Sequence, residues 1–266
     1  MVGVPIDLVP DFPTNAATIL LTAASKCDPD LVAKTKDFVQ KGGTAIATTG
    51  LIEALGDKGF QDIAEIEVTG HRVLATGFGG GRRGGGGAPA SAGMLLPQMR
   101  HFENDTWTSM EFSTADSGYP MLVRAAYGRG TFYVLALPDD FADIYRLPQS
   151  VLTQIRTLLG RDLFVSIDAP DHVSLFVYDN RAFIVQNFQN KAVTTRVTAR
   201  ATALRDLLSG KTIASSGGAA RAGRGGGGGG GARGGGGARG GGGAGGGSSS
   251  FEVPVAAHSF RVFAAQ

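Results

Sequence analysis

ATILLTAASKCDPDLVAKTKDFVQKGGTAIATTGLIEAL, residues 17–55, is the stretch that decides the fold of this chain. Its first apolar run, Ala17–Thr22, predicts a strand buried on both faces, and Thr44–Thr49 predicts a second such strand. Between them, Leu31–Gln40 carries apolar side chains at helical spacing. The succession of strand, helix and strand is the βαβ pattern, which indicates an α/β fold with a parallel sheet.

Short signals mark the ends of these elements. In Asp28-Pro29-Asp30, the first aspartate can cap the helix, the proline suits its first turn and the second aspartate complements its dipole. Gly42-Gly43 predicts the C-terminal cap, and Leu51–Leu55 predicts a short second helix. Upstream, Gly3-Val4-Pro5-Ile6 predicts a short edge strand, where proline is tolerated.

The middle of the chain alternates between strand signals and glycine. Residues 62–76 alternate weakly and predict strands. The tract Gly77–Gly93 (GFGGGRRGGGGAPASAG) has too few apolar side chains for a core, so we expect a loop or disorder there. Beyond it, Met121–Ala126 and Thr131–Leu137 predict a β-hairpin around the turn Gly128-Arg129-Gly130.

The last hundred residues have a different pattern. After the helix predicted over Val151–Leu159, strand signals recur at short intervals with turn residues between them, which is typical of an antiparallel β-sandwich. We therefore predict an α/β domain over residues 1–160 and a β-sandwich over residues 161–266. A second tract, 215–250, holds glycines and four arginines, and we expect it to be a disordered insertion, since loop closure costs grow slowly with length. This tract interrupts the sandwich between Leu207–Ile213 and Phe251–Val255. The predicted sandwich strands are Leu163–Ile167, Val173–Tyr178, Ala182–Asn187, Val193–Val197 and Phe260–Phe263.

Composition excludes several classes of protein. Glycine accounts for 42 of 266 residues, and the net charge of +2 is too small to indicate nucleic acid as an obligate partner. A single cysteine, Cys27, rules out an internal disulfide. The start, MVGVPIDLVPDF, lacks the basic and apolar regions of a signal peptide, so we expect a cytoplasmic location by default. No apolar run reaches about 18 residues, so we expect no membrane span.

Four segments resemble parts of a known multidomain architecture. Residues 17–55 resemble the class I glutamine amidotransferase-like domain in the middle of many glycoside hydrolases, such as the bacterial β-galactosidases with a trimerising middle domain. Tyr127–Leu137 (YGRGTFYVLAL) resembles the late strand of such domains, and Ala203–Ile213 with Phe251–Phe263 resembles the closing hairpin of the C-terminal β-sandwich. The resemblance implies a flavodoxin-like, partly parallel sheet with flanking helices, followed by a small antiparallel β-sandwich.

The same resemblance bears on activity. In that family the hydrolytic carboxylates lie on a preceding (β/α)₈ barrel, and this chain contains no such barrel. The resemblance therefore implies a non-catalytic assembly or accessory region, a fragment or a partner of a catalytic region, with no activity of its own. It also implies a second copy or the barrel as partner, and carbohydrate as a possible ligand.

Five residues are candidates for ligand binding. Asp139, Asp140 and Asp143 follow the strongest predicted strand, and ligands of open α/β sheets collect beyond the carboxyl ends of strands. These carboxylates could bind sugar hydroxyls or a cation, or one could act as a general base. Helix capping is the competing interpretation and carries more weight, because Pro-Asp-Asp-Phe is an ordinary helix start. Trp107 and Tyr145 could stack on a sugar, although core or interface packing is the commoner fate of aromatic side chains.

Other motifs predict no site. Cys27 lacks the glycine-flanked turn that a nucleophilic elbow needs, so we interpret it as a bystander thiol. Ser209-Gly210-Lys211-Thr212 is similar to a phosphate loop, but Arg205 stands where that motif requires glycine, so we predict a β-turn. The four histidines show no metal-binding spacing, and we predict neither a metal nor a cofactor.

Two alternatives to the accessory role stay open. The chain could be a divergent hydrolase that uses the carboxylates between Asp139 and Asp143. It could also bind nucleic acid through its glycine–arginine tracts, although these tracts contain hardly any aromatic side chain for base stacking, so nucleic acid is the less favoured partner.

Overall fold

The first half of the chain is built on one mixed, seven-stranded sheet. The computed structural model describes residues 3–56, 59–79, 88–102, 105–216 and 247–266. Only β1, β2 and β7 run parallel, and every other pairing in this sheet is antiparallel. The predicted α/β class is therefore confirmed, while the flavodoxin-like arrangement stays a prediction. In their order across the sheet, the strands are β1 (Thr18–Leu21), β2 (Thr44–Thr48), β7 (Gly130–Leu135), β6 (Gly118–Tyr127), β5 (Thr106–Ser113), β3 (Ile66–Gly79) and β4 (Ala88–His101).

The strand β1 differs from its prediction in burial. Ile19 and Leu21 are buried, but Thr18 and Leu20 on the other face are only half-buried. The reason is the position of β1 at the edge of the sheet, with β2 as its one neighbour. All five residues of β2 are buried, as predicted, because that strand lies between β1 and β7.

The helix α1 (Leu31–Gln40) begins and ends where the sequence predicts. At its end, Gly42 N–H donates to the Val39 carbonyl and Gly43 N–H donates to the Phe38 carbonyl, which is the Schellman pattern. Gly42 adopts a φ of 112°, a left-handed conformation that favours glycine. At its start the prediction was wrong: the capping position belongs to Asp30, whose side chain accepts no capping hydrogen bond. A short 3-10 helix, η1 (Ala23–Cys27), precedes it, and Asp28 instead accepts the Asp30 N–H and the Lys34 ammonium.

Two further predictions near glycine were wrong. Residues 3–6 form no strand: Gly3 has a φ of 77°, and a Cβ there would lie 2.1 Å from the Val173 carbonyl oxygen. The tract 77–93 is partly strand, because residues 77–79 belong to β3 and residues 88–93 to β4, where backbone pairing needs no side chain. Residues 80–87 lie outside the described part of the chain.

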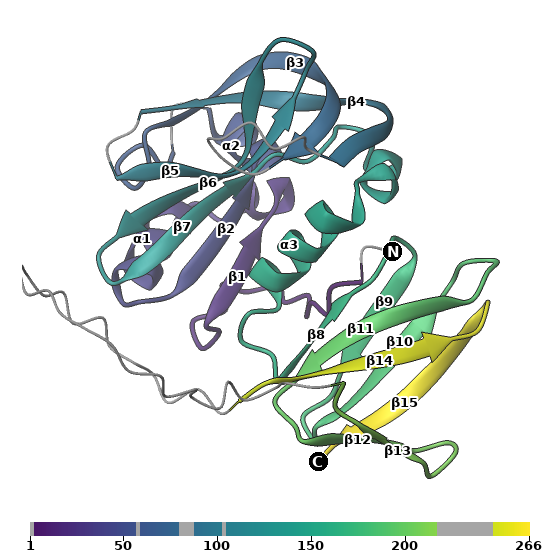
Figure 1. Ribbon diagram of the computed structural model, residues 1–266. Coiled ribbons are helices and arrows are strands. Elements are labelled where there is room, and N and C mark those ends of the chain that lie inside the picture. The colour runs from purple at the N-terminus through teal and green to yellow at the C-terminus, as the bar shows by residue number, and fades with distance from the viewer. Residues whose placement is uncertain (1–2, 57–58, 80–87, 103–104, 217–246) are drawn as a thin grey trace, which may run out of the picture.

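The hairpin of β6 and β7 is confirmed, with Tyr127 opposite Gly130 across a two-residue turn. Gly128 in that turn has a φ of 60°, and a Cβ there would lie 2.7 Å from the Cα of Gln40. The turn therefore packs against the end of α1. The other helical segments of this half are α2 (Thr49–Leu55), η2 (Phe141–Arg146) and α3 (Gln149–Leu159). Figure 1 shows α3 on the face of the sheet turned towards the viewer and α1 on the opposite face.

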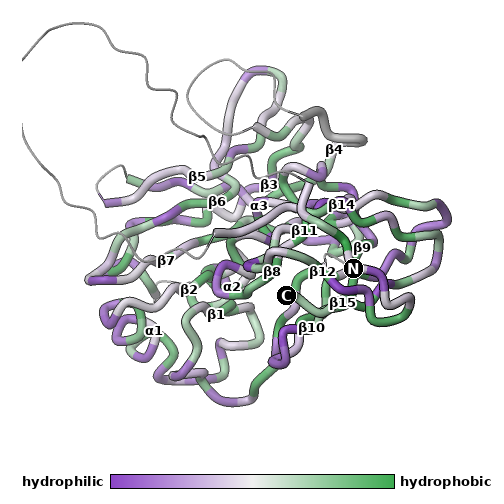
Figure 2. The backbone as a smooth tube through the Cα atoms, turned by 60° about the horizontal axis from the view of Figure 1, so that its bottom comes forward, coloured by the Kyte–Doolittle hydropathy of each residue, from purple (hydrophilic) through white to green (hydrophobic). Residues whose placement is uncertain are grey.

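The second half contains two antiparallel sheets with their own core. Buried side chains from both sheets, among them Phe183, Phe251 and Phe263, form a cluster separate from that of the first half. Figure 2 shows the hydrophobic stretches of these strands alternating with polar turns. The five-stranded sheet has the order β13 (Thr212–Ala214), β12 (Ala203–Asp206), β15 (Ser259–Ala265), β10 (Ala182–Asn187) and β9 (Val173–Val177); the three-stranded sheet has the order β14 (Ser249–Val255), β11 (Val193–Ala199) and β8 (Val165–Asp168).

A buried arginine of α3 joins the two halves. Arg156 is 3% exposed, and its guanidinium donates to the carbonyl oxygens of Ala169, Pro170 and Val173, which belong to the connection from β8 to β9 and the start of β9. Burial lowers the pKa of Arg156 to about 10, so the side chain is still charged at neutral pH. Thr153 and Gln149 on the same helix donate to the Asp168 carboxylate at 2.8 Å. Polar contacts from the first residue of α3 to Arg156 near its end thus hold the sandwich against this helix.

Candidate functional site

The three predicted acids follow β7, and each has its own structural partner. Asp140 caps η2 by accepting the Ala142 N–H at 2.8 Å. Asp143 pairs with Arg146 three residues on. Asp139 accepts from Nε of Arg72 at 2.5 Å, and its side chain is 58% exposed. Capping and ion pairing therefore occupy these carboxylates, and their predicted role in ligand binding stays a prediction.

Arg72 of β3 connects Asp139 with a second carboxylate. Its guanidinium also binds Glu53 of α2 in a two-pronged pair, with Nη1–Oε1 at 2.9 Å and Nη2–Oε2 at 3.3 Å. The hydrogen bond that Arg72 donates to Asp139, together with the one to Glu53, raises the pKa of Arg72 against the opposing effect of partial burial. This network holds the carboxyl end of α2 against β3, and sequence reasoning gave no sign of it because its members are far apart in the chain.

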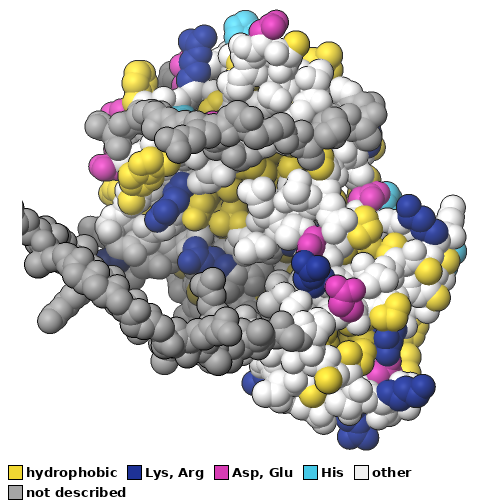
Figure 3. All heavy atoms as spheres, viewed as in Figure 1, with side chains coloured by type: hydrophobic (Ala, Val, Ile, Leu, Met, Phe, Trp, Pro, Cys, Tyr) yellow, Lys and Arg dark blue, Asp and Glu magenta, His cyan; other side chains and the backbone are white. Residues whose placement is uncertain are grey.

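The two candidate aromatic residues have different surroundings. Trp107 on β5 is 49% exposed, and the Cζ atom of Arg124 on β6 lies 5.8 Å from its ring centroid. Tyr145 on η2 lies against His172 of the second half, with ring centroids 4.6 Å apart. His172 in turn binds Asp171 at 2.6 Å and adopts a φ of 54°. Tyr145 is thus part of the contact between the halves. Figure 3 shows that hydrophobic side chains reach the surface of both halves on the face turned towards the viewer.

A groove of about 820 Å³ lies beside the start of β3. Its volume lies in the range usual for ligand pockets. The helix α2 contributes Ile52 and Glu53, its C-terminal cap contributes Gly56, and the connection to β3 contributes Gln61. The other lining residues are Glu65, Ile66, Glu67, Val68 and Phe102. Phe102 is 70% exposed, whereas Ile66 is 7% exposed.

The sequence analysis missed this groove, although one signal was present. Residues 65–68 read Glu-Ile-Glu-Val, an alternation of acid and apolar side chains that is typical of a strand with two different faces. The local pattern does not show that the strand borders a groove, because this depends on α2 and on which strands pair with β3.

The remaining motifs fall where the sequence places them. Cys27 is an exposed residue at the end of η1. Gly210, with a φ of 70°, lies in the predicted turn, which joins β12 to β13. In the described ranges, no group of three or more histidine, cysteine or acidic side chains has the arrangement of a metal site. Among the described helices, none has the length and apolarity that crossing a membrane requires.

Comparison with protein families matches the second half of the chain. Residues 164–265 match a family described as "Probable glycosyl hydrolase, C-terminal domain". The matched residues include all eight strands of the two antiparallel sheets. No curated protein matches the chain.

Solved structures with a similar arrangement include β-galactosidases. The enzyme from Bacillus circulans sp. alkalophilus is 18% identical, with a TM-score of 0.42, and the match covers 94% of this chain and 32% of that one. The enzyme from Rahnella sp. R3 is 14% identical, with a TM-score of 0.44 and coverage of 92% and 30%. The enzyme from the haloarchaeon Halorubrum lacusprofundi is 14% identical, with a TM-score of 0.44 and coverage of 95% and 32%. The chain therefore spans about a third of the length of these proteins.

Proposed function

We propose that this chain is a non-catalytic accessory region of a glycoside hydrolase-like, carbohydrate-active protein. The observation that carries the proposal is the match of residues 164–265 to the glycosyl hydrolase C-terminal domain. In the proposal, the catalytic barrel lies outside these 266 residues, on the same polypeptide or on a partner, and the chain divides into an α/β domain over residues 1–160 and a sandwich over residues 161–266.

The interactions of the candidate acids support this proposal. A retaining or inverting glycosidase needs two carboxyl groups on either side of one scissile bond. Here Asp139 binds Arg72, Asp140 caps a helix and Asp143 binds Arg146, so the three acids have separate structural roles. The two hydrophobic cores are connected by the buried Arg156, and such a connection is consistent with a rigid accessory region that packs against a larger partner.

Immunodepletion tests the proposal. Antibodies against the purified chain are used to deplete an extract of the source cells, and hydrolysis of nitrophenyl glycosides is measured before and after. We expect a glycosidase activity to leave the extract with the chain. An extract that keeps all of its glycosidase activities after the chain is removed would contradict the proposal.

A further inference from the structure

The groove beside β3 meets that strand along its edge. Four consecutive residues, Glu65 to Val68, line it. Successive side chains of a strand point to opposite faces, so a strand that presented one face would contribute only alternate residues. The groove therefore runs along the backbone of the strand. Alternate side chains of the strand line its two walls, which are called its flanks below.

The pairing of β3 explains why this edge is open. On one side β3 pairs with β4 from Ile66 onwards, but on the other side it pairs with β5 only at residues 77–79. The first half of β3 extends past the end of β5, which stops at Ser113. Among the described residues, no other strand pairs with β3 between residues 66 and 76.

The register shows which backbone groups face the groove. Phe102 N–H donates to the Glu65 carbonyl, so Glu65 directs its backbone groups towards β4, and Glu67, opposite Arg100, does the same. The backbone N–H and carbonyl groups of Ile66 and Val68 therefore point away from β4, towards the groove. The Ile66 N–H is occupied by the Ala64 carbonyl at 2.8 Å. Among the described residues, no backbone partner outside the β3–β4 ladder occupies the Ile66 carbonyl or either backbone group of Val68, so these groups remain for another strand.

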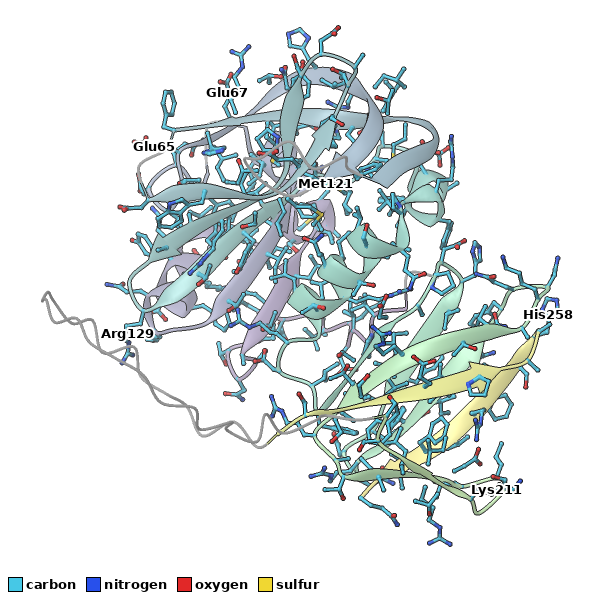
Figure 4. All side chains as sticks on the ribbon, viewed as in Figure 1. Glu65, Glu67, Met121, Arg129, Lys211 and His258 are labelled. Carbon is cyan, nitrogen blue, oxygen red and sulfur yellow. The ribbon has the colours of Figure 1, made fainter. Side chains whose placement is uncertain are left out.

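The two flanks of the groove differ in chemistry. Glu65 and Glu67 share a face with Phe102, because Phe102 is the cross-strand neighbour of Glu65. In the described part of the chain, neither of these two glutamate side chains has a hydrogen-bond or ion-pair partner. Figure 4 shows both on the same side of the first half, away from the sandwich. The opposite flank is apolar, with Ile66, Val68 and Ile52.

Charge on the groove is negative although the whole chain carries +2. Glu53, Glu65 and Glu67 line it, Arg72 is shared between Glu53 and Asp139, and Arg100 stands opposite Glu67. A lysine or arginine placed here would lay its aliphatic stem on Phe102 and bring its charged head to the free carboxylates.

We infer that this groove is a docking site for an extended segment of a partner protein, which adds to the open edge of β3 as a further strand and alternates basic with apolar side chains. Main-chain hydrogen bonds to Ile66 and Val68 supply affinity in this mode, and the alternating flanks supply selectivity. A second copy of this chain does not suit the edge, because pairing β3 with itself would bring glutamates against glutamates. The inference stands independently of the proposed glycoside hydrolase association.

A labelled peptide tests the inference directly. Fluorescence anisotropy with the full chain would use a seven-residue peptide of alternating lysine and valine. Two control peptides are a block-ordered peptide of the same composition and an alternating glutamate–valine peptide. We expect saturable binding of the alternating basic peptide alone, together with slower hydrogen exchange of the Val68 amide, which is the donor on the open edge. No binding, or equal binding of the block-ordered peptide, would overturn the inference and leave the glutamates as charges that protect an exposed edge.

Two pairs of variants separate docking from loss of structure. Val68→Pro removes the open donor while the hydrogen bonds to β4 stay, and we expect affinity about tenfold lower. Val68→Thr keeps that donor and should bind within about threefold of the unchanged chain. Glu65→Lys with Glu67→Lys should transfer binding to the glutamate–valine peptide, while Glu252→Lys on the sandwich should leave the preference unchanged. Thermal unfolding of each variant verifies its fold. Unchanged affinity of folded Val68→Pro, or unchanged preference of the double lysine variant, would also overturn the inference.

Discussion

Replacement of Arg156 by methionine is the sharpest test of how the two halves are joined. The guanidinium makes three described hydrogen bonds to carbonyl oxygens of residues 169, 170 and 173, and it is 3% exposed. Each hydrogen bond from a charged group contributes about 1.5 kcal/mol or more, a sum of about 4.5 kcal/mol. Relief of the cost of burying the charge, the same cost that lowers the pKa to about 10, offsets part of this sum. We expect the free energy of unfolding to fall by about 3 kcal/mol.

Urea unfolding measures this change with two probes. Fluorescence of Trp107, the single tryptophan, reports on the first half, and far-ultraviolet circular dichroism reports on the whole chain. Because Arg156 joins the halves, we also expect the two transitions to separate in Arg156→Met. Arg146→Met is the matched control: its guanidinium pairs with Asp143 at the surface, and its loss should cost less than about 1 kcal/mol. A loss below about 0.5 kcal/mol in Arg156→Met with coincident transitions would refute the reasoning.

Three further predictions concern the sandwich, the sheet and the charge network. Burial raises the pKa of Asp206, but hydrogen bonds from Ser209, Arg261 and Leu208 lower it by more, so the net pKa lies below its usual range. The charged Asp206 therefore stabilises the fold fully above its unfolded-state pKa of about 4, and this contribution is lost as the pH falls through its folded-state pKa. In urea titrations, the free energy of unfolding that Asp206→Asn loses relative to the unchanged chain should become smaller from pH 7 to pH 3. Gly130→Ala would place a Cβ 2.2 Å from the Val39 carbonyl oxygen and should destabilise the chain by about 2 kcal/mol, whereas Gly118→Ala, with its nearest contact at 3.9 Å, should cost under about 1 kcal/mol in the same assay. Arg72→Met removes the ion pairs with Asp139 and Glu53 at a partly exposed site, so we expect the free energy of unfolding to fall by about 1 kcal/mol. Hydrogen exchange of the α2 amides should also become faster. Unchanged exchange would show that the network does not hold that helix.

Elements set by neighbours in the chain could be predicted from the sequence. The helix α1 has the predicted bounds because apolar spacing and Gly42-Gly43 define it locally. The strand β10 also matches its prediction over Ala182–Asn187, and the hairpin of β6 and β7 follows from its glycine turn. Each of these signals lies within a few residues of the element it defines.

Features set by the order of strands could not be predicted in this way. The half-buried face of β1 and the open edge of β3 both follow from which strand lies next to which, and no local pattern carries that information. The tract 77–93 was misassigned for the same reason: Gly77 pairs with Pro89 of β4 and Gly79 with Glu111 of β5, and backbone pairing of this kind needs no side chain. The groove at Glu65 and Glu67 needs α2, β3 and the end of β4 together, so the sequence contributes only its acid–apolar alternation.

The central claim is that the chain assists a glycoside hydrolase without cleaving glycosides itself. The most direct measurement incubates the purified 266-residue chain with a panel of nitrophenyl glycosides and follows release of nitrophenol. The account predicts the same rate as buffer alone for every sugar in the panel. Hydrolysis that copurifies with the chain and disappears in Asp139→Asn or Asp143→Asn would contradict it.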